Sequence, residues 1–196
     1  MTDDPLAPKD DAGTPLNEEE KEGLIPSYIT LRNELNEAEQ ANILGAEDWA
    51  FSRKRDVLDA QFLDKLHGRM YRSVWKWAGI HRTSGKNLGV DAYKIPTEMK
   101  QLIEDCRYWI DHDTYGPDEI AARFHHRLVS IHSYPNGNGR HARLAADLLL
   151  VSMGQERFSW GRANLVDPTK TRKRYIEALV DADQHNIEPL VEFVRS

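Results

Sequence analysis

Apolar residues recur at the three- and four-residue spacing of an amphipathic helix along most of the chain. Glycine or proline marks the ends of these stripes: Gly79 and Gly154 each follow one, and Pro117 opens another. The pattern predicts helices over residues 37–58, 59–77, 98–112, 118–131, 140–153 and 168–182, with a short last helix after Glu188.

One stretch, residues 80–95, breaks the helical spacing. It contains two glycines, and it alternates Leu88, Val90 and Ile95 loosely with polar residues. Alternation of this kind is typical of a half-buried strand, and glycine favours the turn between two strands. We therefore expect an all-α fold that carries one small β-hairpin.

Length and charge narrow the classes of function. A chain of 196 residues can bury one core but hardly two. The net charge of −6 argues against a surface built to bind nucleic acid or an anionic membrane, and we expect neither partner. A local basic site for a phosphate ligand remains open.

The chain has one cysteine, Cys106, no apolar run of membrane-spanning length, and an acidic start unlike a signal peptide. These features predict a cytoplasmic protein. Residues 1–16 are rich in Asp, Pro and Gly, and we expect a disordered tail there. N-terminal helices should then occupy residues 17–58, and a core domain residues 59–196.

Candidate chemistry is concentrated in residues 132–143, HSYPNGNGRHAR, here called the glycine loop. Gly137 and Gly139 let successive backbone N–H groups point to one side, and the helix that follows adds unpaired donors and a partial positive charge. Arg140 and Arg143 are three residues apart and share a helix face. The loop therefore predicts a site for two or more phosphate groups, although a glycine-rich helix connector with surface arginines would have the same sequence.

His132 favours catalysis over a simple connector. A neutral imidazole at the edge of a phosphate site can take a proton from an attacking nucleophile. The alternative is a histidine that caps the end of the preceding helix. A metal shared with His125 is excluded, because seven helical residues rise about 10.5 Å. His125 is more consistent with packing or with a surface position.

These residues resemble the loop of the Fic/Doc family, His-x-Phe-x-(Asp/Glu)-Gly-Asn-Gly-Arg-x-x-Arg, with Tyr134 and Asn136 as the two departures. The resemblance extends over about residues 60–195. It implies the Fic fold and transfer of AMP from ATP to a hydroxyl side chain of a protein target. It also implies roles for single residues: His132 as general base, Gly137, Asn138 and Gly139 around the phosphates, Arg140 on a middle phosphate, Arg143 on the terminal one, and a flap at residues 86–95, centred on Leu88, Gly89 and Val90, that docks the target.

The two departures modify these expectations. A buried Tyr134 needs a partner for its hydroxyl group. Asn136 replaces the acid that ligates Mg²⁺ in the family, and it keeps an oxygen but loses the charge that Mg²⁺ prefers. Mg²⁺ stays an expected cofactor, held mainly by the ATP phosphates and water. Asn136 also leaves open transfer of phosphocholine or phosphate, removal of AMP, or a non-catalytic, toxin-like module.

Residues 30–36, TLRNELN, resemble the family's inhibitory motif (Ser/Thr)-x-x-x-Glu-(Gly/Asn), with Asn36 one position late. The resemblance implies that Glu34 pairs with Arg143 and blocks the terminal phosphate; a solvated glutamate is the alternative. Residues 22–40 also resemble the Fic subgroup called mobile mystery protein B, whose members are associated with mobile elements and a companion protein. A companion regulatory protein is therefore an expected partner.

Overall fold

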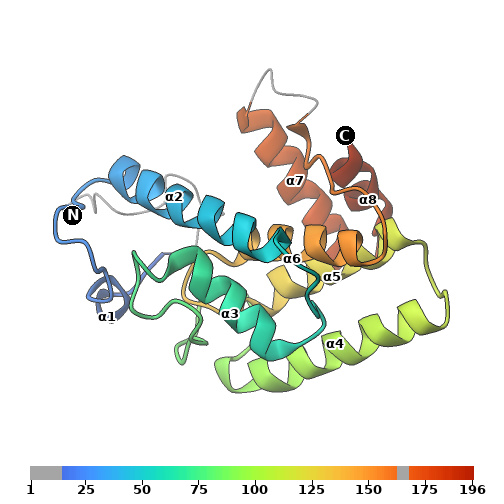
Figure 1. Cartoon of the computed structure of the whole chain (residues 1–196), viewed down its shortest axis with the longest axis horizontal. Helices are drawn as coiled ribbons and strands as arrows, with labels where there is room; N and C mark the ends of the chain where they lie inside the picture. The colour runs from blue at the N-terminus through green and yellow to red at the C-terminus, as the bar shows by residue number, and fades with distance from the viewer. Residues whose placement is uncertain (1–14, 163–167) are drawn as a thin grey trace.

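Helices supply nearly all the regular structure in residues 15–162 and 168–196, the parts of the chain that this computed structural model describes (Figure 1). The predicted tail lies outside them except for residues 15 and 16. The α-helices are α1 (Glu18–Lys21), α2 (Arg32–Phe51), α3 (Ala60–Tyr71), α4 (Ile95–Asp111), α5 (Pro117–Ile131), α6 (Asn138–Ser152), α7 (Pro168–Asp183) and α8 (Glu188–Arg195), and a 3-10 turn, η1 (Ala92–Lys94), precedes α4.

The centre of the fold is helix α6, which packs along α5. Every residue from Leu144 to Leu150 is buried, and a helix that is covered on all sides must lie inside the fold. Helices α2 and α3 pack together and also contact α6, α4 runs along α5, and α7 pairs with α8. The glycine loop lies between α5 and α6, so the most buried part of the molecule positions it.

Two kinds of sequence prediction need correction, and the first concerns helix boundaries. The helix predicted over residues 37–58 is α2, which begins at Arg32 and ends at Phe51. The predicted helix to residue 77 ends at Tyr71, after which the chain turns and the N–H groups of Val74 and Trp75 both donate to the Tyr71 carbonyl. Trp75 is fully buried and forms a β-bridge with Leu24. The apolar spacing of residues 72–77 thus comes from a tight turn that packs on the N-terminal segment.

The second correction concerns the β-hairpin. Residues 80–91 contain no strand in the described structure. The N–H groups of Arg82 and Val90 donate instead to the carbonyls of Ser133 and Ile131, at 2.9 and 3.4 Å. A hairpin alone is only marginally stable, and here the backbone bonds go to the end of α5 and the glycine loop.

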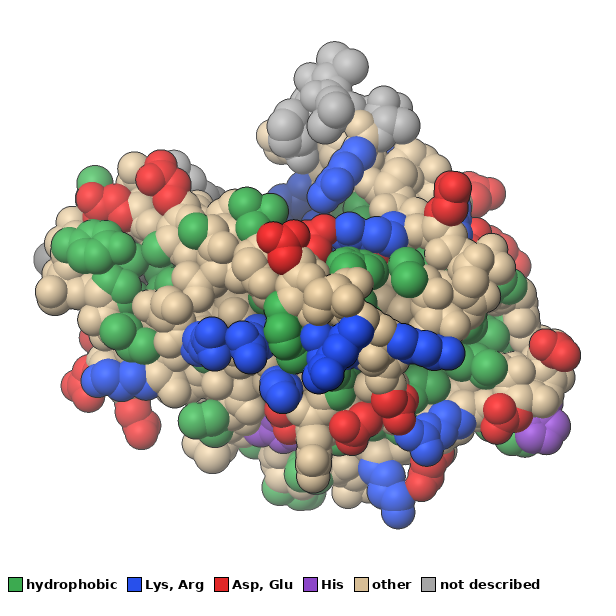
Figure 2. All heavy atoms as spheres, viewed as in Figure 1, with side chains coloured by type: hydrophobic (Ala, Val, Ile, Leu, Met, Phe, Trp, Pro, Cys, Tyr) green, Lys and Arg blue, Asp and Glu red, His purple; other side chains and the backbone are tan. Residues whose placement is uncertain are grey.

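The outer face of α3 carries positive charge, while its inner face packs on α6. Figure 2 shows Lys and Arg side chains gathered across the middle of this view, over α3 and the end of α2. The guanidinium groups of Arg55 and Arg69 lie 4.2 and 4.9 Å from the centre of the Trp49 ring. Within the described ranges, no helix combines the length and apolar character needed to cross a bilayer.

Asp147 fixes the segment after α6 against the core. Its buried carboxylate accepts hydrogen bonds from the Phe158 N–H at 3.2 Å and the Trp160 indole N–H at 3.0 Å, and Arg157 adds an ion pair. Trp160 in turn packs on His125 of α5, with ring centres 4.7 Å apart. One carboxylate therefore holds three residues of an irregular segment beside the helices that carry the glycine loop.

We predict that Asp147→Ala lowers the free energy of unfolding by about 2–4 kcal/mol, because it leaves two buried N–H donors without an acceptor. Urea denaturation followed by circular dichroism measures this loss. The control is Asp111→Ala, at the exposed end of α4, which should stay within about 0.5 kcal/mol of the parent. Equal stability of the two variants would contradict the role given to Asp147.

Candidate active site

The glycine loop reverses the chain between two residues in the left-handed conformation. His132 ends α5 with φ 56° and ψ 58°, and Gly137 precedes α6 with φ 81°. A Cβ at position 137 would lie 2.6 Å from ring atoms of Tyr71, so only glycine fits there. The close approach of Tyr71 therefore constrains the backbone of the loop at position 137.

Asn138 closes the loop with a reciprocal pair of hydrogen bonds. Its side-chain oxygen accepts from the Tyr134 N–H at 2.9 Å, and its amide nitrogen donates to the Tyr134 carbonyl at 2.8 Å. The Asn138 side chain thus shapes the loop and is not directed at a ligand. The first backbone bond of α6 runs from His141 to Gly137, which leaves the N–H groups of residues 138–140 as the unpaired helix start that suits an anion.

An aromatic cluster of Tyr134 and His67 packs against the loop. The Tyr134 hydroxyl donates to Asp64 at 2.8 Å, the kind of partner that the buried phenol was expected to need. Its ring stacks on His67 at 3.7 Å. His67 Nδ1 accepts the Gly79 N–H, so Nε2 carries the proton and donates to the Asn136 carbonyl at 3.1 Å. Burial holds the pKa of His67 well below its usual range and keeps the ring neutral.

Asn136 does not offer its side-chain oxygen to a metal ion. That oxygen accepts the N–H of Gly137 at 2.7 Å and so points back into the loop. Among the described residues, no three His, Cys, Asp or Glu side chains gather closely enough to hold a metal. The side chain of Asn136 therefore does not fit the Mg²⁺ role predicted for it.

Burial keeps His132 in the neutral form that a general base needs. Its side chain is buried, with 6% of the residue exposed. Burial, followed by the charges of Arg82 and Lys86, lowers the pKa of His132 to about 4. The imidazole is therefore neutral at pH 7 and can accept a proton.

Arg140 is held by a glutamate from α2. Its guanidinium donates to Glu39 at 2.7 Å and lies over the ring of Tyr71, 5.2 Å from the centroid. Glu39 is buried, and its other oxygen accepts the indole N–H of Trp75 at 2.7 Å. The predicted phosphate-binding arginine thus already has an anionic partner in this structure.

Arg143 lies one helical turn further along α6. Its guanidinium is 5.4 Å from the centre of the Tyr175 ring, and its Nε donates to the Gly139 carbonyl at 3.3 Å. The Tyr175 hydroxyl pairs with Nε2 of His125 at 3.0 Å. Tyr175 therefore links α5, α6 and α7 beside the helix start, and His125 is a packing residue, as the sequence indicated.

The structure brings Glu39, and not Glu34, to a loop arginine, and that arginine is Arg140 rather than Arg143. Glu34 lies in the first turn of α2, where its carboxylate accepts the N–H groups of Thr30 and Leu31 at 2.8 and 3.0 Å. These bonds lower the pKa of Glu34, and the side chain faces solvent. Five helical residues rotate the side-chain direction by about 140°, so the two glutamates lie on different faces of α2.

A signal for Glu39 was present in the sequence. The buried positions of α2 are Leu35, Glu39, Ala46 and Ala50. This spacing is a helical stripe that turns toward the core, and Glu39 is its charged member. A carboxylate on an otherwise apolar face needs a buried partner, and Arg140 is that partner.

The flap lies beside His132 even though it forms no strand. A Cβ at Gly89, which has φ 98°, would come within 2.5 Å of the His132 Cβ. The Leu88 side chain is exposed. Lys86 forms a nearly buried ion pair with Glu20 of α1, which ties the N-terminal segment to the flap.

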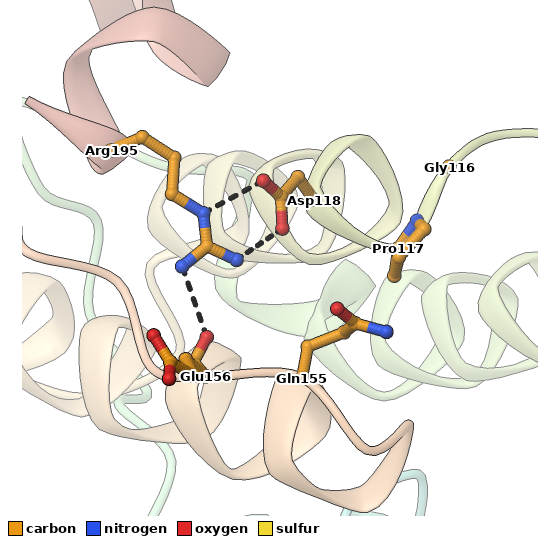
Figure 3. A pocket seen from close by; sticks show the side chains of 6 residues that line it. All are labelled: Gly116, Pro117, Asp118, Gln155, Glu156 and Arg195. Carbon is orange, nitrogen blue, oxygen red and sulfur yellow. Dashed lines mark hydrogen bonds and ion pairs between the residues drawn. The ribbon is translucent and has the colours of Figure 1, made fainter.

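A pocket lies at the ends of α5 and α6 that are opposite the glycine loop. It is formed where the start of α5, the segment after α6 and the end of α8 meet (Figure 3). Arg195 crosses it and donates to Asp118 and to the backbone carbonyls of Glu156 and Arg157. Its guanidinium is thus committed to structural bonds, and this pocket is not a candidate for the chemistry.

Comparison with known proteins agrees with the fold and the loop. Residues 57–150 match the model of the Fic/DOC family, so the chain contains a Fic/DOC family domain. Protein adenylyltransferase fic-1 of Caenorhabditis elegans is 29% identical over 147 residues, and protein adenylyltransferase Fic of Drosophila melanogaster is 27% identical over 135. These matches cover 73% and 67% of this chain, but the chain spans only 28% and 24% of those relatives.

Two solved structures from Bartonella share the fold. The N-terminal Fic domain of a VirB-translocated Bep effector from Bartonella quintana superposes with a TM-score of 0.71, at 18% identity, covering 91% of this chain and 92% of that one. BepC of Bartonella tribocorum, solved with bound AMPPNP, gives a TM-score of 0.70 at 18% identity, covering 91% and 97%. At this identity the likeness establishes the fold.

The buried histidines make stability depend on pH. Burial lowers the pKa of His141, whose Nε2 pairs with the Leu63 carbonyl at 3.0 Å, to about 4 from its ordinary 6.5. Between these pH values the unfolded chain binds more protons than the folded chain, so stability falls as the pH drops through that window.

We predict that lowering the pH from 7 to 5 destabilises the parent more than His141→Gln, a variant that keeps a donor for Leu63. The two losses in free energy of unfolding should differ by about 2 kcal/mol. Urea denaturation at both pH values measures the difference. The exposed His112→Gln variant is the matched control and should follow the parent. An unchanged pH dependence in His141→Gln would show that this imidazole is not kept neutral by burial.

Proposed function

We propose that this chain transfers AMP from ATP to a hydroxyl side chain of a protein target. The observation that carries the proposal is a neutral, buried His132 next to a helix start with unpaired N–H groups and two arginines. The relatives named protein adenylyltransferases support the choice of AMP as the transferred group.

In the proposed reaction the target's hydroxyl oxygen attacks the α-phosphorus of ATP. A new oxygen–phosphorus bond forms, the bond to the bridging oxygen breaks, and pyrophosphate leaves. His132 takes the hydroxyl proton, which its neutral state allows. The N–H groups at the start of α6, with Arg140 and Arg143, stabilise the charge that develops on the departing phosphates.

Docking of the target is assigned to the flap. Its backbone contacts His132 at Gly89, and the exposed Leu88 is next to that contact. A target segment lying along residues 88–90 would therefore present its side chain near the imidazole. This role concerns the backbone, so it does not require the flap to be a strand before the target binds.

Autoinhibition is proposed to act through Glu39. A triphosphate needs the Arg140 guanidinium, and Glu39 already pairs with it. ATP must compete for that guanidinium with a buried carboxylate that also holds Trp75. The inhibitory glutamate of α2 is then Glu39, while Glu34 stabilises the start of the same helix.

Asn136 supports a second candidate function, a Fic-fold enzyme with other phosphate chemistry. The site lacks the acid that the family uses at this position, and the Asn136 oxygen that remains is turned into the loop. The mass added to a modified protein separates AMP, phosphocholine and phosphate transfer. We also propose, on the resemblance of residues 22–40, that the chain belongs to the mobile mystery protein B subgroup and has a companion protein.

The catalytic proposal predicts that His132→Ala lowers AMP incorporation at least about 100-fold, the usual scale for loss of a general base. Incorporation is measured with α-labelled ATP and mass spectrometry, in a Glu39→Gln background that frees Arg140. His112→Ala, at the exposed end of α4, is the control. A full rate in His132→Ala, or no AMP incorporation and no ATP binding in the background itself, would exclude the proposed function.

The inhibitory proposal predicts that Glu39→Gln binds ATP about tenfold more tightly than the parent, because it removes the negative charge that pairs with Arg140 while keeping an acceptor for Trp75. Isothermal titration calorimetry with ATP measures the affinity. Glu34→Gln is the matched variant on the same helix, and it should bind ATP like the parent while lowering the unfolding midpoint. A gain of affinity in Glu34→Gln alone would restore Glu34 as the inhibitory residue.

A further inference from the structure

One arginine, Arg82, joins the flap region to the glycine loop. Its guanidinium Nε donates to the His132 carbonyl at 2.6 Å, Nη1 donates to Ser84 at 2.8 Å, and Nη2 donates to the carbonyl of Val90. Its own backbone N–H donates to Ser133 at 2.9 Å. A single side chain therefore bonds to both segments that the proposed reaction must bring together.

The setting of Arg82 is unusual for a cation. The residue is 4% exposed, and its guanidinium donates to the backbone carbonyls of His132, Ser84 and Val90. Burial lowers the pKa of Arg82, against the opposing charges of Asp91 and Glu20. Burying a cation is costly unless its donors are satisfied, and the planar fork of arginine satisfies several diverging carbonyls at once. Lysine cannot reproduce that geometry.

The bond to His132 acts on a strained residue. A left-handed conformation is uncommon for a residue with a Cβ, and it persists where the surroundings enforce it. At the end of α5 the carbonyls of Ile131 and His132 have no helical partners, and Arg82 approaches both, at 3.5 and 2.6 Å. The arginine thus holds the backbone that aims the imidazole.

The bond to Val90 acts on the flap. Val90 also donates its N–H to the Ile131 carbonyl, and the next residue toward the N-terminus, Gly89, contacts His132 directly. A Cβ at Gly89 would lie 2.8 Å from Nη2 of Arg82 and 2.5 Å from the His132 Cβ. Gly89 of the flap, the Arg82 guanidinium and His132 therefore pack so closely that no side chain fits at position 89.

We propose that Arg82 is a positioning residue, which locks the flap backbone at residues 88–90 to the backbone of His132, so that a docked target chain presents its hydroxyl at the imidazole. The effect on rate rests on the proposed function; the mechanical link between the two segments does not. Arg82 itself touches neither ATP nor the reacting hydroxyl.

The first test measures how firmly Arg82 holds the flap, and it needs no catalytic activity. In Arg82→Gln, amide hydrogen exchange at Val90 should accelerate at least about tenfold, while amides in the middle of α6 keep their protection. Arg195→Gln is the matched control, since Arg195 also donates to two backbone carbonyls but lies at the pocket of Figure 3. Unchanged exchange at Val90 in Arg82→Gln would overturn the proposal, whether or not the chain transfers AMP.

The second test uses AMP transfer in the Glu39→Gln background. Arg82→Gln should lower kcat about 100-fold and leave the affinity for ATP unchanged, because Arg82 is not part of the phosphate site. Arg82→Lys keeps the charge but loses the fork, and it should show the same loss. A parallel loss of ATP affinity would indicate general damage to the loop and would count against a positioning role.

The imidazole gives a third readout. The charges that lower the pKa of His132 are those of Arg82 and Lys86, and Lys86 is itself paired with Glu20. An NMR titration should therefore show a higher His132 pKa in Arg82→Gln than in the parent, and little change in Arg82→Lys. If Arg82→Gln does not fold, Gly89→Ala disturbs the same packing from the flap side: its Cβ would lie too close to both His132 and the Arg82 guanidinium, so the flap must move and kcat should fall while ATP still binds. A normal kcat in Gly89→Ala would contradict the proposal.

Discussion

The tight reversal of the chain between α5 and α6 is the constraint on which the rest of this structure depends. His132 and Gly137 both take the left-handed conformation, and the paired hydrogen bonds between Tyr134 and Asn138 close the turn. This geometry fixes where α6 begins, and therefore where its unpaired N–H groups point. It also decides from which side of the helix Arg140 and Arg143 emerge.

The carboxylate that pairs with Arg140 comes from outside the residues that match the family model. The loop supplies cations and a neutral histidine, and Glu39 of α2 supplies the carboxylate that balances Arg140. Helix α2 precedes residues 57–150, the range that matches the Fic/DOC family model. Because Glu39 is buried and bonded through both oxygens, its removal from Arg140 requires movement of the helix or a strongly competing anion.

The structure also separates residues that shape the loop from residues available for ligands. Asn138 and Asn136 were predicted to face phosphate or metal, yet their side chains satisfy the loop's own backbone groups. Such buried donors and acceptors must find partners, and short amide side chains nearby provide them. A motif therefore indicates which residues a loop needs, but it does not show which of them point outward.

The sequence by itself determined where most helices lie, though not where α2 and α3 end, and it determined the position of the reversal, because apolar spacing and glycine placement act over a few residues. It failed where the deciding contact was distant. Glu39 meets Arg140 across 101 positions, and Arg82 meets His132 across 50. The predicted hairpin was wrong for the same reason, since its backbone bonds go to the end of α5 and the glycine loop. Only tertiary structure decides such pairings, because they depend on which helix faces are packed together and on which buried groups still lack a partner.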